Sequence, residues 1–227
     1  MAAEHAEGRR LGRAAFLGLS AATVGALFLG KEAIPRIDLA PSLDSVNGFT
    51  IYTVINGYPS FHPATFRLEV DGLVEKPLSL SLPEILHHPA TVEVRNYQCV
   101  TGWSVPNCRW QGIRLSALLD RVVPHPDAHA LLFSSFDGVY TESLTMRQAL
   151  TSDVMVAYAL NGKPLSRAQG APLRLVVPEM YGYKYIKWLN RIQLVRQPQD
   201  GFWEVRGYDR DAYIGHSNGY GPPLAKT

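Results

Sequence analysis

The feature that most constrains this chain is Cys99, which stands where a predicted strand gives way to a loop. Residues 92–97 include β-branched and aromatic side chains, which favour a strand. Gly102, Pro106 and Asn107 follow closely, and these residue types favour turns over regular pairing. We therefore expect the thiol to lie at a strand end, on a loop held by a stiff scaffold, which is a common position for functional side chains.

A helix is predicted after this loop, because Ile113, Leu115, Leu118 and Leu119 recur at helical spacing. Ser116 is a candidate for its N-cap. The rest of the pattern predicts strands over residues 66–70, 130–136, 154–160 and 173–177, short helices over 83–87 and 144–150, and a hairpin turn at Asn161-Gly162.

Three roles are open to Cys99 from spacing alone. Cys108 lies nine positions further on, so a disulfide that closes a short loop is one of them, and it suits an exported protein. A second role is a soft thiolate ligand of a metal, and the third is a nucleophile beside a histidine. The absence of C-x-x-C, H-E-x-x-H and a second Cys/His cluster nearby disfavours zinc. The candidate histidine partners are His62, His87, His88, His125 and His129.

A resemblance extends over most of the chain from residue 49 onward. The segment Q-C-V-T-G-W-S-V-P-N-C-R-W-Q-G-I-R-L-S-A-L-L, which contains Cys99, resembles the cysteine loop of the molybdopterin-binding domain of the sulfite oxidase superfamily. Further blocks follow in that family's order: G-V-Y-T-E-S-L at 138–144, D-V-M-V-A-Y-A-L-N-G-K-P-L at 153–165, G-A-P-L-R-L-V-V-P-E-M-Y-G-Y-K-Y-I-K-W-L-N-R-I at 170–192 and G-F-W-E-V-R-G-Y-D at 201–209. Separated blocks in one order are far more specific than a single motif.

The resemblance implies an α+β fold of mixed β-sheets with short helices, and an oxidoreductase that carries molybdenum with one molybdopterin. Cys99 would ligate the metal, since thiolate is a soft, strongly donating ligand. Tyr208 would be an active-site phenol that donates a hydrogen bond to a metal oxo group. The residues implied to bind the cofactor are Tyr52, Thr53, Asn56, Thr101, Arg174, Tyr183, Lys184 and Lys187. An ordinary strand and turn is the alternative for Tyr52, Thr53 and Asn56, and a surface position is the alternative for Tyr208.

The charges of the basic residues in this set also point to a phosphate, independently of the resemblance. Arg174 interrupts an apolar strand, where a charge is costly without a partner. Lys184 and Lys187 stand three apart after Gly182, which lets the backbone approach a ligand closely. A terminal phosphate would be held by a guanidinium and two ammonium groups. A solvated basic face is the alternative.

The substrate is constrained by two departures from sulfite oxidases. Residues V-T-G-W-S-V-P follow the cysteine where those enzymes carry arginines, and Gln169 stands in place of a histidine. Both departures weaken a sulfite assignment, although Arg109, Arg206 or Arg210 could supply a guanidinium from another loop. The expected chemistry is a two-electron oxygen-atom transfer on a small substrate, with sulfur compounds as candidates. The alternatives are a non-catalytic exported domain with a Cys99–Cys108 disulfide, and a cysteine-dependent thiol enzyme.

The N-terminus reads as a targeting or anchoring segment. Arg9, Arg10 and Arg13 precede residues 14–30, a run of 17 residues without a charge. As a helix the run would be about 25 Å long, enough to cross a bilayer with snorkelling flanks. The arginines would stay in the cytoplasm and the domain outside. The Arg-Arg run also resembles a twin-arginine export signal. No clean A-x-A cleavage site follows the apolar run, so we expect a transmembrane anchor, with export and processing as the alternative.

The chain of 227 residues is long enough for one globular domain and a short extension. We expect an export signal or anchor at residues 1–30, a linker at 31–48 and the molybdopterin-binding domain at 49–227. A net charge of +2 gives no sign of a nucleic-acid partner. No C-x-x-C-H haem-attachment motif is present, so a separate membrane cytochrome or quinone-linked subunit is the expected redox partner.

Overall fold

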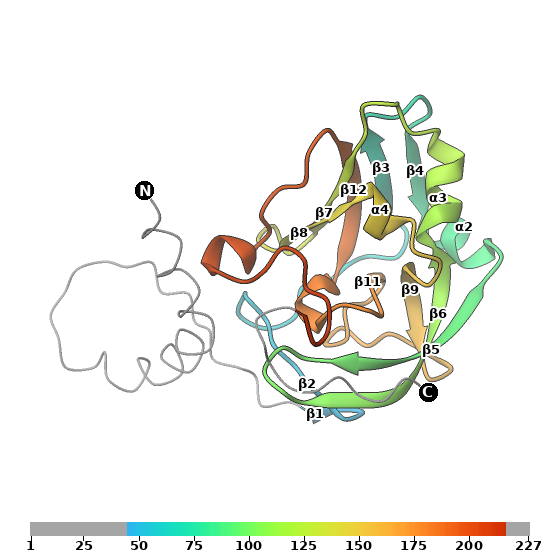
Figure 1. Cartoon of the computed structure of the whole chain (residues 1–227). Helices are drawn as coiled ribbons and strands as arrows, with labels where there is room; N and C mark the ends of the chain where they lie inside the picture. The colour runs from blue at the N-terminus through green and yellow to red at the C-terminus, as the bar shows by residue number, and fades with distance from the viewer. Residues whose placement is uncertain (1–44, 217–227) are drawn as a thin grey trace, which may run out of the picture.

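The computed structural model describes residues 45–216, which form two five-stranded sheets with short helices at their margins (Figure 1). The first sheet has the order β4-β3-β12-β7-β8, and only its β3–β12 pair is parallel. Its strands are β3 (Arg67–Gly72), β4 (Leu78–Ser81), β7 (Ala130–Ser135), β8 (Thr141–Thr145) and β12 (Leu189–Val195).

The second sheet is antiparallel, with the order β10-β9-β6-β5, and β11 also pairs with β9. Its strands are β5 (Thr91–Gln98), β6 (Ser104–Arg114), β9 (Met155–Leu160), β10 (Lys163–Pro164) and β11 (Arg174–Val176). A small hairpin precedes both sheets, formed by β1 (Ser45–Val46) and β2 (Phe49–Thr50). The helices are α2 (Leu82–His87), α3 (Leu115–Val122) and α4 (Met146–Ala149), with 3-10 turns η2 (Gly182–Lys184) and η3 (Glu204–Arg206). The α+β fold of mixed sheets and short helices is confirmed.

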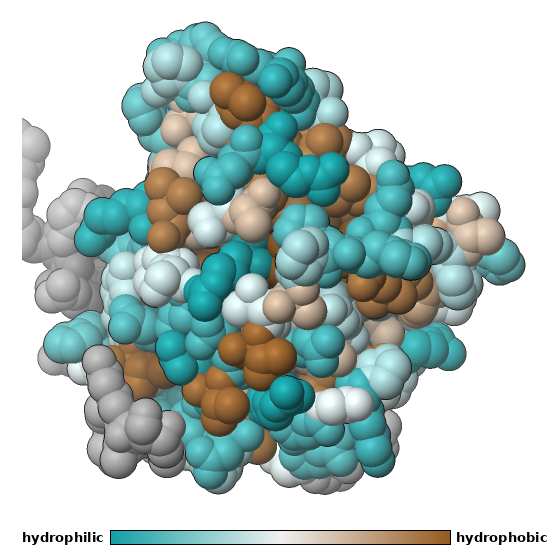
Figure 2. Space-filling model, turned by 90° about the vertical axis from the view of Figure 1, so that its right-hand side faces the viewer, coloured by the Kyte–Doolittle hydropathy of each residue, from teal (hydrophilic) through white to brown (hydrophobic). Residues whose placement is uncertain are grey.

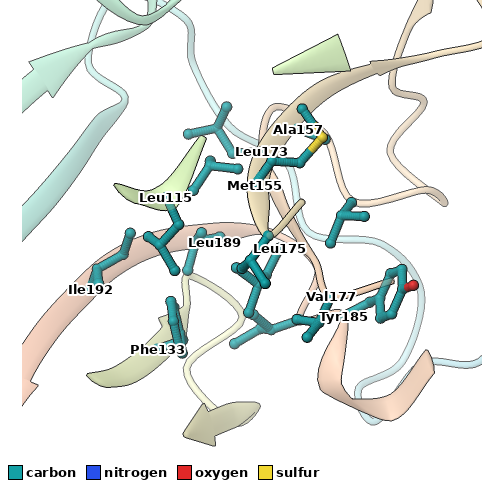
Figure 3. Close-up of a cluster of buried hydrophobic side chains, with 14 of the residues drawn as sticks. Leu115, Phe133, Met155, Ala157, Leu173, Leu175, Val177, Tyr185, Leu189 and Ile192 are labelled. Carbon is teal, nitrogen blue, oxygen red and sulfur yellow. The ribbon is translucent and has the colours of Figure 1, made fainter. Parts of the chain in front are cut away.

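The hydrophobic core joins the two sheets. Figure 3 shows Phe133 of β7 and Ile192 of β12 in one cluster with Met155 of β9 and Leu175 of β11. Leu115, the first residue of α3, packs into the same cluster. All five side chains are fully buried. Burial of such side chains contributes about 1.5–3 kcal/mol each relative to exposure, so this cluster fixes the position of one sheet against the other.

Gly112 allows β6 and β9 to approach closely. A Cβ atom at this position would lie 2.1 Å from the carbonyl oxygen of Val156 and 2.6 Å from the Cα of Ala157. The strand register shifts by a bulge between Gln111 and Gly112. Only glycine is compatible with this backbone contact.

The predicted loop after Gly102 is shorter than expected. β6 begins at Ser104 and runs through Pro106 and Asn107. Asn107 takes a left-handed φ of 53°, and its N–H donates to Oδ1 of Asn96 beside a register shift in the β5–β6 pair. An irregular ladder therefore accommodates residues that would end a regular one.

Two helix predictions also need correction. Helix α3 starts at Leu115 after Arg114, which makes no side-chain capping bond, so Ser116 lies inside the helix and Ile113 belongs to β6. The helix predicted over 144–150 is limited to α4, because Leu144 completes β8. The remaining predicted strands and helix α2 are confirmed, as is the turn at Asn161-Gly162, where both residues have positive φ.

Exposed hydrophobic side chains are scattered over several elements. In the face shown in Figure 2, hydrophobic patches are separated by hydrophilic residues. The large exposed hydrophobic residues are Leu86, Val92, Val94, Val139, Leu150 and Val205.

The expectation of a transmembrane helix is wrong for the part of the chain that the structure describes. No helix within residues 45–216 is long and apolar enough to span a bilayer. The run at 14–30 for which that helix was predicted, and most of the predicted linker, lie outside the described residues.

Candidate active site

A cavity of about 320 Å³ is enclosed by four segments that are distant in sequence. They are residues 49–54, which comprise β2 and the chain after it, residues 97–101 at the end of β5, residues 182–188 around η2, and residues 203–208 around η3. Asp137, Tyr140, Gln169 and Arg174 complete the polar part of the wall.

Cys99 lies on this wall directly after β5, as predicted from the strand end. Its backbone N–H donates to the carbonyl of Trp103 at 2.9 Å, and its carbonyl accepts from the N–H of Gly102 at 3.1 Å. Its Sγ lies 3.2 Å from Oγ1 of Thr101. Burial raises the pKa of the thiol, whereas the Thr101 hydroxyl lowers it. A bound cation would overcome the effect of burial, because a coordinating thiol is deprotonated.

Aromatic rings form the wall beside the thiol. The Tyr97 ring lies 5.0 Å from Phe49, 5.3 Å from Trp103 and 5.2 Å from Tyr185, centroid to centroid. A Cβ atom on Gly182 would lie 2.0 Å from the Tyr97 hydroxyl oxygen, so this glycine makes room for the phenol. Burial raises the pKa of Tyr97 far above its ordinary value, so the phenol remains neutral.

Arg174 and Lys187 place two cations on the wall, and neither forms an ion pair with a carboxylate within residues 45–216. The Arg174 guanidinium donates to the carbonyls of Gln169 and Tyr185 at 3.0 and 3.1 Å, and its Nε is buried without a partner among the described residues. Burial lowers the pKa of Arg174.

The Lys187 ammonium donates to the carbonyl of Tyr52 at 2.6 Å and lies 4.4 Å from the centre of the Trp188 ring. Although the side chain keeps some exposure, its surroundings lower the pKa of Lys187 to about 7, mainly by desolvation and then by the charge of Arg174. Asp137 on the same wall offsets part of this positive charge. Two cations that repel each other in one cavity are stabilised by an anionic group.

Lys184 does not lie on the wall, so its predicted place beside a phosphate needs correction. Its ammonium is fully buried and donates to Glu142 and to Glu204, the latter at 2.9 Å. Both ion-pair partners come from outside its own segment and satisfy the charge inside the protein. The spacing of three residues between Lys184 and Lys187 did not predict that their side chains have different environments.

The C-terminal wall carries Tyr208, Trp203 and Arg206. The Tyr208 ring lies 5.0 Å from Trp203 and 5.3 Å from Tyr183. The Tyr183 hydroxyl donates to the carbonyl of Asp209 at 2.6 Å, which ties this segment to η2. Arg206 is largely exposed and donates to the carbonyl of Phe202.

The cavity brings together most residues predicted to bind a cofactor or act in catalysis. Asn56 and Lys184 are the exceptions, since Asn56 is exposed and absent from the lining. The predicted residues on the wall are Tyr52, Thr53, Cys99, Thr101, Arg174, Tyr183, Lys187 and Tyr208. Their chemical roles stay predictions.

Several wall residues were missed as site residues from the sequence. Tyr97 precedes Cys99 by two positions, and the period of a strand would have predicted that both face one side. Tyr140 lies within the resembling block at 138–144 and Asp137 directly precedes it, but neither residue was singled out from the sequence. Trp203 had no local signal beyond its place in the G-F-W-E-V-R-G-Y-D block.

The disulfide alternative is wrong in this structure, because Cys99 and Cys108 are both free thiols. Cys108 is fully buried, and its Sγ lies 3.4 Å from the carbonyl of Val105. No histidine within residues 45–216 lines the cavity, so none of the candidate histidine partners lies beside Cys99 on its wall. The same part of the chain contains no group of three His, Cys, Asp or Glu side chains placed to hold a metal.

Comparison with known protein families identifies the family of this chain. The model of the oxidoreductase molybdopterin-binding domain family matches residues 55–203. The chain belongs to this family. It is therefore a molybdopterin-dependent oxidoreductase, and its cofactor is molybdenum with molybdopterin.

Individual relatives cover much of this oxidoreductase. An uncharacterized oxidoreductase of Bacillus subtilis, YuiH, is 35% identical over 63% of this chain and 72% of its own. The protein-methionine-sulfoxide reductase catalytic subunit MsrP of Gluconobacter oxydans is 32% identical over 92% of this chain and 75% of its own. The sulfane dehydrogenase SoxCD of Paracoccus pantotrophus has the same fold, with a TM-score of 0.59 and 24% identity, over 75% of this chain and 50% of that chain.

The cavity suits the cofactor of the family. Cys99 offers one soft sulfur donor, and the unpartnered Nε of Arg174 offers a buried donor to an anionic group. Lys187 adds a second positive charge, and aromatic side chains form much of the remaining wall. These residues provide for the metal, the phosphate and the ring system of a molybdopterin.

Proposed function

We propose that this oxidoreductase reduces a sulfoxide, with methionine sulfoxide as the substrate class. The observation that carries the proposal is the make-up of the wall. Two of its cations, Arg174 and Lys187, are suited to the cofactor's phosphate, whereas the neighbours of Cys99 are neutral groups such as Tyr97, Val100 and Thr101. A neutral, polar S=O group suits that surface better than an anion does, because it needs no buried counter-charge.

Two further observations support this substrate class. Residues V-T-G-W-S-V-P follow Cys99 where sulfite oxidases carry arginines, and Gln169 stands in place of their histidine. Several relatives, including the one from Gluconobacter oxydans, are named as protein-methionine-sulfoxide reductase catalytic subunits.

Each residue of the cavity would have a distinct role in this reaction. Cys99 would hold the metal, which when bound supplies a two-electron centre that accepts the substrate oxygen. Arg174 and Lys187 would hold the phosphate. Tyr208 would orient the S=O group through a hydrogen bond from its phenol, and Trp203 would shield that position from water.

Oxidation of an anionic sulfur compound is the second candidate. Arg206 lines the cavity from an exposed position and could attract an anion to its mouth. The structural likeness to SoxCD supports the fold for such an enzyme and nothing beyond it.

A direct assay separates the two candidates. The protein is produced in a host that makes molybdopterin, and its metal content is measured. Turnover is then followed with methionine sulfoxide and a reduced viologen dye, and with sulfite and an oxidised dye. We expect molybdenum in the protein and turnover of the sulfoxide. Turnover of sulfite alone would replace the first candidate with the second.

We also propose that the domain works outside the cytoplasmic membrane and receives electrons from a membrane cytochrome or a quinone-linked subunit. The Arg-Arg run near the N-terminus supports export of a folded, cofactor-loaded protein. Fractionation of cells that express the full chain tests the location. Recovery of the loaded enzyme in the cytoplasm alone would contradict it.

A further inference from the structure

Glu142, Lys184 and Glu204 form a buried group, here called the acid–lysine cluster, which the proposed function leaves unused. Glu142 comes from β8, Lys184 from η2 and Glu204 from η3. The Lys184 side chain is 0% exposed and both carboxyl side chains are 1% exposed. The ammonium donates to Oε1 of each carboxyl, and the backbone N–H of Ser143 donates to Oε1 of Glu142 at 2.7 Å.

The charges of this cluster do not balance unless it holds a proton. One ammonium faces two carboxyls, so ionisation of both would leave a surplus negative charge in the interior. The second oxygen, Oε2, of each carboxyl is buried and has no partner among the described residues. An unpaired buried charge costs several kcal/mol, and a proton on one Oε2 removes it.

The electrostatics of Glu142 agree with a held proton. Burial raises its pKa, Lys184 lowers it and Glu204 raises it again, which together bring the pKa of Glu142 to about 8. Among residues 45–216, Lys184 and Glu204 are the charged groups that act on it, and both carboxyls act in turn on the Tyr140 phenol. Tyr97 and Tyr183 are the other titratable groups around that phenol.

Each member of the cluster lies one or two residues along the chain from a residue of the cavity wall. Tyr183 precedes Lys184, Trp203 precedes Glu204, and Tyr140 stands two residues before Glu142. The Tyr140 hydroxyl donates to the carbonyl of Tyr183 at 2.6 Å, which links two of these wall residues directly. The cluster therefore lies at the back of the wall that faces the substrate.

We propose that the acid–lysine cluster is a proton donor for the reaction in the cavity, with Glu142 and Glu204 sharing the proton. The inference rests on the proposed sulfoxide reduction. In that reaction the S–O bond breaks, sulfur gains two electrons from a haem protein or a quinol, and the oxygen leaves as water after taking up two protons. One proton comes from the cluster and the other from solvent, and solvent then reloads the cluster.

Glu142→Gln and Glu204→Gln test the role, because glutamine keeps the shape and an oxygen acceptor for Lys184 but leaves a neutral cluster with no spare proton. Infrared spectroscopy of cofactor-free protein at neutral pH should show a protonated carboxyl band in the wild type that disappears in either variant. In loaded enzyme, kcat per molybdenum should fall roughly a hundredfold with KM unchanged. The decline of wild-type kcat above a pH of about 8 should be absent from the variants.

Two comparisons keep the result specific. Glu142→Asp retains a carboxyl, so it should keep the carboxyl band and part of the turnover that Glu142→Gln loses. It also provides a test if a glutamine variant folds poorly. Glu93→Gln removes an ion pair with Arg114, and neither residue lines the cavity. This variant should change neither the carboxyl band nor the turnover. Lack of the carboxyl band in the wild type overturns the proposal whatever the substrate proves to be. Normal kcat per molybdenum in folded Glu142→Gln and Glu204→Gln overturns it as well, whereas failure of the wild type to reduce sulfoxides removes the proposed function instead.

Discussion

At position 99, a hydroxyl in place of the thiol would change the softness of the donor much more than its size. The residue is 8% exposed and its thiol contacts Thr101, whose hydroxyl can form a hydrogen bond with sulfur or oxygen. The local fold should therefore tolerate the exchange, whereas binding of a high-valent metal should not.

Cys99→Ser is expected to reduce turnover to the level of cofactor-free protein while the melting temperature changes little. Turnover and molybdenum content are measured on the same preparation. Cys108→Ser is the matched control, since that thiol is buried away from the cavity lining and should cost stability without abolishing turnover. Equal loss of turnover in the two variants would remove Cys99 from its assigned role.

The cations of the wall give a second prediction at the residue scale. Arg174→Gln or Lys187→Met should each weaken cofactor retention by about 2 kcal/mol, or roughly thirtyfold, because each removes a charge-assisted partner of a phosphate. Retention is measured as molybdenum content after dialysis. Arg191→Gln, which breaks an exposed ion pair with Asp71, should change retention hardly at all. Unchanged retention in both cavity variants would place the phosphate elsewhere.

Among the elements, β6 determines most of the site geometry, because it is paired with β5 on one side and β9 on the other. One of its irregularities falls at Asn107, near the end of β5 that leads into Cys99. The other falls at Gly112, which pairs with Thr91 at the start of β5 and lies beside β9. A distortion of the ladder near Asn107 would therefore reach the metal-binding position, whereas one at Gly112 would act mainly on the pairing with β9.

Gly112→Ala should destabilise the protein by about 1–3 kcal/mol, since its methyl group would overlap the backbone of β9 at Val156. The free energy of unfolding is measured by denaturant titration. Gly138→Asn is the control, because nothing lies within 4 Å of that position and asparagine tolerates its φ of 76°. Equal stability of Gly112→Ala and the wild type would show that the two strands can separate at little cost.

The elements also show what the sequence could predict. Alternation of Phe66, Leu68 and Val70 was sufficient to place β3, because one face of that strand is buried and the other is not. The prediction for β6 was wrong at Pro106, which lies inside the strand. The strand continues there because the β5–β6 register shifts, and local turn preference cannot predict such a shift. In the site, block resemblance found Arg174 and Lys187, whereas the different surroundings of Lys184 depend on Glu142 and Glu204, which only the tertiary fold brings to it.

For the molecule as a whole, the acid–lysine cluster makes stability depend on pH. The ordinary pKa of a glutamate is 4.5, and in the folded protein the pKa of Glu142 is about 8. Between these values the folded state holds a proton that the unfolded state has lost, so rising pH favours unfolding. The contribution is present below pH 4.5 and disappears as the pH approaches 8.

Wild-type stability should therefore fall by up to about 1.4 kcal/mol per pH unit within this window, relative to Glu142→Gln. Denaturant titrations of both proteins at a series of pH values provide the difference, in which other titrating groups such as Lys187 cancel. Parallel pH profiles would mean that Glu142 is ionised throughout.

The parallel pairing of β3 with β12 has a consequence for the way the molecule is made. Arg191 stands opposite Glu69 across this pair, so the central part of the first sheet joins segments from opposite ends of the described chain. A nascent polypeptide on the ribosome cannot form this pair, or the wall at 203–208, until nearly the whole domain has been synthesised. Contacts of such long sequence separation slow folding. The cavity should therefore be completed after translation of these late segments, which leaves an interval in which the cofactor can enter before the wall closes.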